Sequence, residues 1–178
     1  KSLIEAINHG GLANKVKVTI KWIDSELIEN KNSDVKNIFK DINGIIVPGG
    51  FGKRGSEGKI NAIKFARLNN IPFFGICFGM QMAVLEFARN VLKLDNASSS
   101  EFGKNNLSMI GLLTEWQSKT GLEKRNENSN LGGTMRLGAY DCKLVENSFV
   151  KSIYKKNMIS ERHRHRYEVN NKFNLEFK

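Results

Sequence analysis

Apolar runs and helix-like segments alternate along the first half of the chain. Residues 44–47 and 71–74 are short apolar runs of the kind that forms buried parallel strands. Apolar residues at helical spacing follow each run, ending near residue 70 after the first and near residue 92 after the second. Residues 16–22 alternate between apolar and polar and predict a further strand. Strands that alternate with helices predict an α/β domain with a doubly wound, mostly parallel sheet.

Local signals indicate where other elements begin and end. Ser2-Leu3-Ile4-Glu5 is typical of a capping box, and Gly10-Gly11 predicts the end of that helix. Ser56 predicts the N-cap of the helix after residues 44–47. Further expectations are a weak helix over 34–39, a loop over 95–106, a strand over 109–114, a charged loop over 117–130, an extended segment over 135–145 and a short helix over 148–154.

Composition narrows the class of protein. The chain has 178 residues, 40% of them hydrophobic, and contains neither a membrane-length apolar stretch nor a visible signal peptide. Its net charge is +10, but the basic residues are scattered and aromatic residues do not interleave with them, so we expect no nucleic-acid and no membrane partner. Cys77 and Cys142 are too few for a disulfide framework, which favours the cytoplasm, and Cys142 is expected to be structural.

The segment Gly75-Ile76-Cys77-Phe78-Gly79 carries the strongest chemical signal. It lies where an apolar strand passes abruptly into a helix, and such a turn needs small residues on both sides of a strained central residue. This is the pattern of a nucleophile elbow with sulfur in place of oxygen, and a helix N-terminus is expected to favour thiolate over thiol. A buried core cysteine is the alternative, and we favour the nucleophile.

A second glycine-rich segment, Gly50-Phe51-Gly52-Lys53-Arg54-Gly55, allows three interpretations. It matches G-x-G-x-x-G of dinucleotide-binding folds, but residues 70–80 contain no Asp or Glu that could bind a ribose. A plain tight turn is the second interpretation. The third is an oxyanion hole, which we favour because Gly50 and Cys77 both follow predicted parallel strands and would share one crevice.

Residues 161–168 are dense in charge. Strand alternation puts His163 and His165 on one face, and because no cluster of Cys or carboxylates accompanies them we expect no metal site. Solvated charges on an edge strand are one interpretation, and an Arg that binds a carboxylate is another. The glycines of residues 131–138 predict a turn or bulge to which spacing alone assigns no chemistry.

Together these motifs resemble the class I, triad-type glutamine amidotransferases. The resemblance rests on Pro48–Gly52 followed by Gly75–Gln81. Residues 99–102, 131–138 and 161–170 are similar to the glutaminase module of the CTP synthase family, and the match covers essentially the whole chain. It implies a flavodoxin-like α/β fold, with residues 1–178 as one glutaminase domain that hydrolyses L-glutamine and supplies ammonia for the ATP-dependent amination of UTP to CTP.

The resemblance also implies roles for particular residues. Cys77 would form a γ-glutamyl thioester, and backbone N–H groups of Gly50 and Phe78 would bind the oxyanion. Glu101 suits the α-ammonium group of glutamine. The implied glutamine-binding residues are Gly50, Phe78, Gly79, Met80, Gln81, Glu101 and Arg166.

The implied partners lie largely outside this domain. The family uses no cofactor in the glutaminase module. It uses ATP and Mg²⁺ in a synthetase domain of the same polypeptide. The full-length protein of the family is expected to form a homo-oligomer, a tetramer. GTP is its effector, and Arg125 would lie near the GTP site.

The sequence also departs from the family pattern. The family supplies its general base as His in a Phe-His-Pro-Glu segment, and none of His9, His163 and His165 stands in that context. We therefore expect a module incomplete at both ends, without the synthetase domain and with its base elsewhere. A non-catalytic glutamine-sensing or scaffold domain of the same fold is the alternative hypothesis, and a nucleotide-binding Rossmann domain that uses Gly50–Gly55 is a weaker one.

Overall fold

The computed structural model describes residues 1–30, 33–103, 107–112, 115–118, 121–124, 135–170 and 173, with 115–118 and 121–124 described by their backbone alone. The first half contains α1 (Ser2–Ala13), η1 (Ser25–Ile28), α2 (Val35–Ile38), β1 (Ile45–Val47), α3 (Ser56–Leu68), β2 (Phe73–Gly75) and α4 (Phe78–Asn90). The second half contains β3 (Ser98–Ser99), η2 (Ser100–Phe102), β4 (Ser108–Leu112), β5 (Glu115–Ser118), β6 (Gly121–Lys124), β7 (Arg136–Lys143), α5 (Phe149–Tyr154), β8 (Met158–His165) and β9 (Tyr167–Val169).

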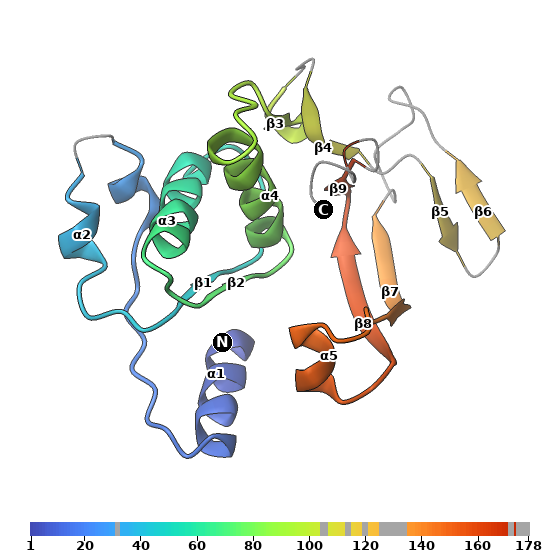
Figure 1. Cartoon of the computed structure of the whole chain (residues 1–178). Helices are drawn as coiled ribbons and strands as arrows, with labels where there is room; N and C mark the ends of the chain where they lie inside the picture. Colours follow the sequence, from blue (N-terminus) through green and yellow to red (C-terminus); the bar gives the residue numbers. More distant parts are fainter. Residues whose placement is uncertain are drawn as a thin grey trace.

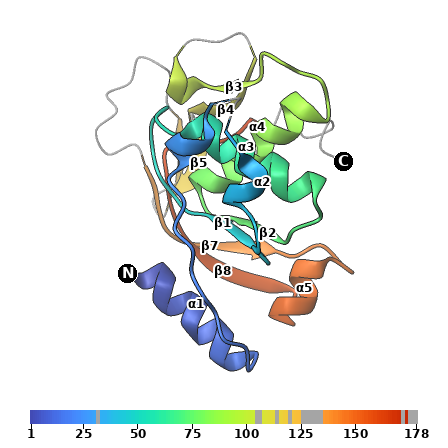
Figure 2. The ribbon, with the colours of Figure 1, turned by 90° about the vertical axis from the view of Figure 1, so that its left-hand side faces the viewer.

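The first half forms the predicted α/β layer. Strands β1 and β2 pair in parallel, with Ile45 beside Phe73 and Val47 beside Gly75. Helices α3 and α4 cover one face of this pair, and α1 lies on the opposite side of it (Figures 1 and 2). Because the strands are parallel, the chain leaves both of them at the same edge, as expected for Gly50 and Cys77.

The core lies between these strands and the two helices that cover them. Its most deeply buried apolar side chains, each at most 2% exposed, are Ile28, Ala66, Phe78, Met82, Leu85, Ala88, Ala97, Met109 and Ile110. Members come from both halves, so the second half packs on α4 and is not a separate unit.

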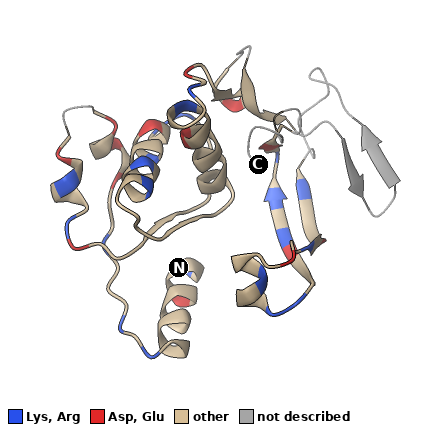
Figure 3. Cartoon of the chain, in the orientation of Figure 1, with Lys and Arg blue, Asp and Glu red and all other residues tan. Residues whose placement is uncertain are grey.

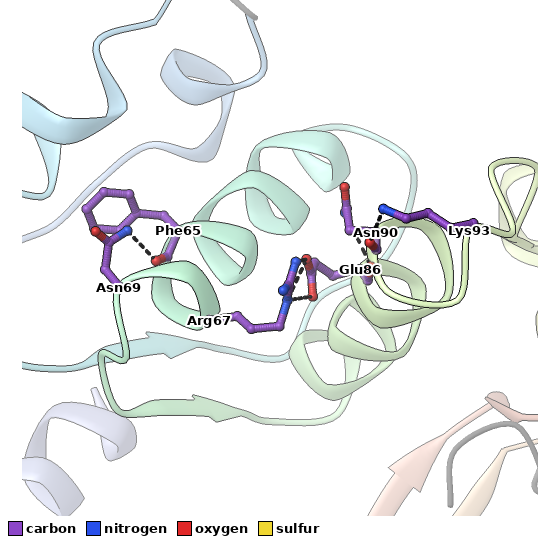
Figure 4. A network of polar contacts seen from close by, with 6 residues as sticks. All are labelled: Phe65, Arg67, Asn69, Glu86, Asn90 and Lys93. Carbon is purple, nitrogen blue, oxygen red and sulfur yellow. Dashed lines mark hydrogen bonds and ion pairs between the residues drawn. The ribbon is translucent and has the colours of Figure 1, made fainter.

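An ion pair with a buried carboxylate and a partly exposed guanidinium joins the two covering helices. Arg67 of α3 donates hydrogen bonds from Nε and Nη2 to the carboxylate of Glu86 in α4, whose side chain is 2% exposed (Figure 4). Such a buried carboxylate depends on its partner, because an unpaired charge in the interior is costly. The pair therefore fixes α4, which carries Cys77 at its N-terminus, against α3.

The second half forms several small sheets. Strand β4 pairs in parallel with β3 and antiparallel with β9, while β7 and β8 form an antiparallel ribbon. The expected strand, extended segment and short helix are confirmed as β4, β7 and α5, and Ser148 Oγ caps α5 by accepting from the Lys151 N–H at 3.2 Å. The charged loop expected over 117–130 is wrong in part, because β5 and β6 form an antiparallel pair there.

Several other local predictions are wrong. Residues 16–22 form no strand, since no described strand lies beside them to complete a hydrogen-bonded pair. Helix α1 has Lys1 as its N-cap without a side-chain hydrogen bond, and it continues past Gly10-Gly11 to Ala13. Gly55, with φ of +69°, is the N-cap of α3 in place of Ser56.

Charge is spread over the molecule as the sequence indicates. Lys and Arg occur on elements of both halves, namely α2, α3, α4, β7, α5 and β8, and Asp and Glu are interspersed with them along the chain (Figure 3). Among the described residues, none of the helices has the length and apolar character needed to cross a membrane.

Candidate active site

The turn from β2 into α4 has the geometry of a nucleophile elbow. Cys77 is the N-cap of α4 and has φ of +53° and ψ of −106°, a strained conformation for any residue except glycine. A Cβ on Gly75 would lie 2.7 Å from the backbone N of Met80, and one on Gly79 would collide with the Val47 carbonyl oxygen. The expected requirement for glycine on both sides of Cys77 is therefore confirmed.

The Cys77 thiol is half-buried and lies beside a backbone carbonyl. Its Sγ donates to the carbonyl oxygen of Arg164, 3.9 Å away, at the end of β8. Burial raises the pKa of the thiol, the Phe78 N–H opposes this, and the Glu101 carboxylate adds to it. The expectation of a thiolate is therefore wrong for this conformation, because burial outweighs the favourable helix terminus.

The glycine loop after β1 lies against the elbow. A Cβ on Gly49 would be 3.6 Å from the Cys77 Cβ, and one on Gly50 would be 3.8 Å from Phe78 Cδ1. The Ile76 N–H donates to the Val47 carbonyl at 3.0 Å and so connects the elbow to the end of β1. The structure thus brings Gly50 and Cys77 into one region, as the parallel strands predict.

Glu101 reaches the same loop from η2. Its Oε1 accepts a hydrogen bond from the Gly52 N–H at 2.7 Å, and the loop residue Gly52 has φ of +81°. Phe102 packs edge-on against Phe78, with ring centroids 6.2 Å apart. The Phe78 side chain therefore belongs to the core, while its backbone N–H stays at the elbow beside Cys77.

The junction of β8 and β9 lies against α4. Gln81, which is 5% exposed, donates from Nε2 to the Tyr167 carbonyl oxygen at 2.7 Å. Arg166 lies between this contact and the one from Arg164 to Cys77, so the junction also brings Arg166 toward the elbow. The Arg166 Nε is buried and has no hydrogen-bond partner among the described residues, which leaves a donor for an anionic ligand.

The remaining predicted residues occupy distinct environments. Gly79 is buried against β1, and Met80 at the start of α4 is 41% exposed. Arg125 and the glycines at 132 and 133 lie outside the described residues.

His163 and His165 share one face of β8, as predicted, but contact each other. His163 Nδ1 lies 2.9 Å from His165 Nε2, and Glu168 and Arg136 lie close by. Burial, followed by the charge of Arg136, lowers the pKa of both imidazoles. Both imidazoles are half-buried, whereas Glu161, Arg162 and Arg164 on the same strand are exposed, as the interpretation of solvated charges on an edge strand predicts.

The described part of the chain contains no group of three or more His, Cys, Asp and Glu that could hold a metal ion. No hydrogen bond joins Cys77 to an imidazole within the same residues.

The contacts that sequence reasoning missed use backbone atoms. The Arg164 and Tyr167 carbonyls and the Gly52 N–H each contact a predicted site residue. Every residue has a carbonyl and every residue except proline has an N–H, so residue type gives almost no signal for these contacts. Only the spatial arrangement of the strands could reveal them.

Fold and site together define a glutamine amidotransferase of class I. The model of the family "Glutamine amidotransferase class-I" matches residues 1–178, and the chain belongs to this family. The predicted α/β fold of this family, in one domain, is thereby confirmed. The expected mostly parallel sheet is seen only in part, because among the described strands β1–β2 and β3–β4 pair in parallel and the other pairs are antiparallel.

Similar proteins point to one branch of the family. CTP synthase of Sphingopyxis alaskensis is 60% identical over 170 residues, which are 96% of this chain and 31% of that protein. CTP synthase of Pelagibacter ubique is 59% identical over 99% of this chain and 32% of that protein. A solved Trypanosoma brucei CTPS glutaminase domain with bound acivicin superposes with a TM-score of 0.83 at 38% identity, covering 99% of this chain and 64% of that one. The chain thus spans about a third of its curated relatives' length.

Proposed function

We propose that this chain is the glutaminase part of a CTP synthase and hydrolyses the side-chain amide of L-glutamine. The observation that carries the proposal is the strained Cys77 between two obligatory glycines, next to the Gly49–Gly52 loop. The high identity to proteins named CTP synthase supports the choice of this branch.

In the proposed reaction Cys77 Sγ attacks the amide carbon of glutamine. A general base outside the three histidines takes the thiol proton, and the carbonyl oxygen becomes an oxyanion bound by the N–H groups of Gly50 and Phe78. Collapse breaks the C–N bond, and the nitrogen takes the proton and leaves as ammonia. Water then hydrolyses the thioester to glutamate and restores the thiol.

The amino-acid end of glutamine is proposed to bind opposite the reacting carbonyl. The Glu101 carboxylate suits an α-ammonium group, and the unpartnered Arg166 Nε suits the α-carboxylate. Gln81 is fixed by its contact with Tyr167 and would contact the ligand from the first turn of α4. Gly79 and Met80 would line the same site at the start of α4.

The rest of the proposed reaction belongs to the larger protein. We assign ATP, Mg²⁺ and the amination of UTP to a synthetase domain, with GTP as effector near Arg125, a homotetrameric assembly and a cytoplasmic location. Support comes from the relatives named CTP synthase, of which this chain spans 31–32%. The glutaminase part itself would need no cofactor.

Active-site labelling tests the proposal. An alkylating glutamine analogue, applied to the full-length protein and followed by mass spectrometry, should modify Cys77, and excess glutamine should protect it. The exposed Cys142 is the internal control and should be neither modified nor protected. Modification of Cys142 with Cys77 intact would refute the assignment.

A glutamine-sensing domain without catalysis is the second candidate. The raised pKa of Cys77 and its contact with the Arg164 carbonyl favour this alternative. Calorimetric binding of glutamine without release of glutamate or ammonia would establish it, whereas turnover that is abolished in C77S would exclude it.

A further inference from the structure

One carboxylate connects the glycine loop after β1 to η2. Glu101 Oε1 accepts from the Gly52 N–H at 2.7 Å across 49 positions of sequence. Glu101 is itself fixed, because its N–H donates at 3.2 Å to Oγ of Ser99, a fully buried residue. Gly52 has the conformational freedom of glycine, which this hydrogen bond restrains.

The same turn also contacts the elbow. Phe102, next to Glu101, packs on Phe78, and the Glu101 charge is near enough to affect the pKa of Cys77. The loop that Glu101 restrains packs in turn against Cys77 and Phe78 through Gly49 and Gly50. Glu101 is thus connected to both sides of the proposed oxyanion hole.

We infer that Glu101 is a positioning residue for the oxyanion-hole loop in addition to a substrate ligand. Its Oε1 holds Gly52, and through the loop Gly50, while Oε2 is left for the α-ammonium group of the substrate. The substrate then binds to the group that sets the geometry of the hole, so binding and acyl transfer depend on one side chain. The substrate part rests on the proposed function, and the loop part on the contact with Gly52.

Two substitutions in the full-length protein separate these roles. E101Q removes the charge but keeps an Oε1 that can accept from Gly52, whereas E101A removes both. Both should raise KM for glutamine at least about tenfold through loss of a charged hydrogen bond. E101Q should keep kcat within about threefold, while E101A should lower kcat about 100-fold, because the hole is misplaced. An equal loss of kcat in both variants would overturn the positioning role.

Amide hydrogen exchange at Gly52 tests the loop contact without catalysis. By NMR, exchange of the Gly52 N–H should be slow in the wild type and in E101Q and at least about tenfold faster in E101A. E57A, which removes a partly exposed carboxylate from α3, is the matched control and should leave Gly52 unchanged. If E101A does not fold, E101L replaces it.

The outcomes distinguish the two proposals. Absence of glutamine hydrolysis by the wild type, with the expected exchange pattern, would refute the proposed function and leave the loop contact standing. Hydrolysis together with equal Gly52 exchange in the wild type, E101Q and E101A would refute the positioning role alone.

Discussion

Cys77 combines a strained backbone with a thiol whose pKa is raised. The half-buried thiol contacts the Arg164 carbonyl, and its burial raises the pKa although Cys77 lies at a helix N-terminus. At neutral pH the thiolate is therefore a smaller fraction than in an ordinary cysteine. Activation then requires a base, or a change in the contacts of the thiol when substrate binds.

The pH dependence of alkylation should report this state. In a C142S background, the rate with iodoacetamide should rise with pH through a midpoint above that of a small model thiol, because only thiolate reacts. E101Q should move the midpoint to lower pH, since the Glu101 charge contributes to the raised pKa. A Cys77 midpoint at or below that of the model thiol would contradict the burial argument.

The candidate site is predictable from sequence to different degrees. Cys77, Gly50 and the glycines of the elbow follow from the strand–turn–helix pattern, because steric demands fix those residue types. The raised pKa of Cys77 does not follow, because it depends on what covers the thiol. That cover is a backbone carbonyl 87 positions away in sequence.

At the scale of elements, the glycines of the elbow set how closely β1 and α4 approach. Gly79 lies directly against the Val47 carbonyl, so the close contact between helix and strand excludes any side chain there. The position of the Cys77 thiol therefore depends on Gly75 and Gly79, each of which has a hydrogen atom where any other residue would have a Cβ.

Gly79→Ala should destabilise the protein by at least about 3 kcal/mol, because backbone on both sides must move. Gly10→Ala is the matched control, since a Cβ there meets nothing within 4 Å and the residue is inside α1. It should stabilise by about 0.5–1 kcal/mol. Urea denaturation measures both, and equal effects would contradict the packing seen at Gly79.

The ion pair between α3 and α4 gives another test. R67M leaves the Glu86 carboxylate buried without its partner and should cost about 3 kcal/mol in chemical denaturation. R67M/E86L removes both charges and should recover most of that loss. E57A is the comparison at the more exposed Arg89 pair and should cost less than about 1 kcal/mol. If the double variant were as unstable as R67M, the cost of R67M would not come from the unpaired Glu86 carboxylate.

Helices were predictable from sequence where a capping residue or the spacing of apolar residues determines them. Ser148 caps α5, and α3 and α4 follow the apolar spacing, since burial of one face selects the helix. The pattern at 16–22 failed, because alternation gives a strand only when a neighbour pairs with it. Ser56 failed as a cap because Gly55 takes the left-handed conformation, and the buried Ser56 hydroxyl has no partner among the described residues.

At the scale of the molecule, the candidate site lies between two halves of one chain. The first half supplies Cys77 and the glycine loop, and the second supplies Glu101, Arg166 and the covering carbonyls. A parallel α/β layer alone would expose the thiol. The arrangement depends on the shared apolar core and on the polar contacts that join the halves.

Gln81 makes one of those contacts and should be a sensitive position. Q81L removes the buried hydrogen bond from the Gln81 amide to the Tyr167 carbonyl and should cost about 1–3 kcal/mol in denaturation. It should also speed alkylation of Cys77, because the segment from Arg164 to Tyr167 loses its attachment. K64A on the exposed face of α3 should change neither. Unchanged stability in Q81L would indicate that the halves are joined without this bond.

The backbone angles of Cys77 imply that folding stability and the proposed nucleophilic role favour different residues at this position. Glycine adopts φ of +53° and ψ of −106° freely, whereas any side chain at position 77 carries a conformational penalty of about 1–3 kcal/mol. A stability screen at this position should therefore favour glycine, a residue with no sulfur. Thermostabilised variants chosen by melting temperature alone would tend to lose their nucleophile.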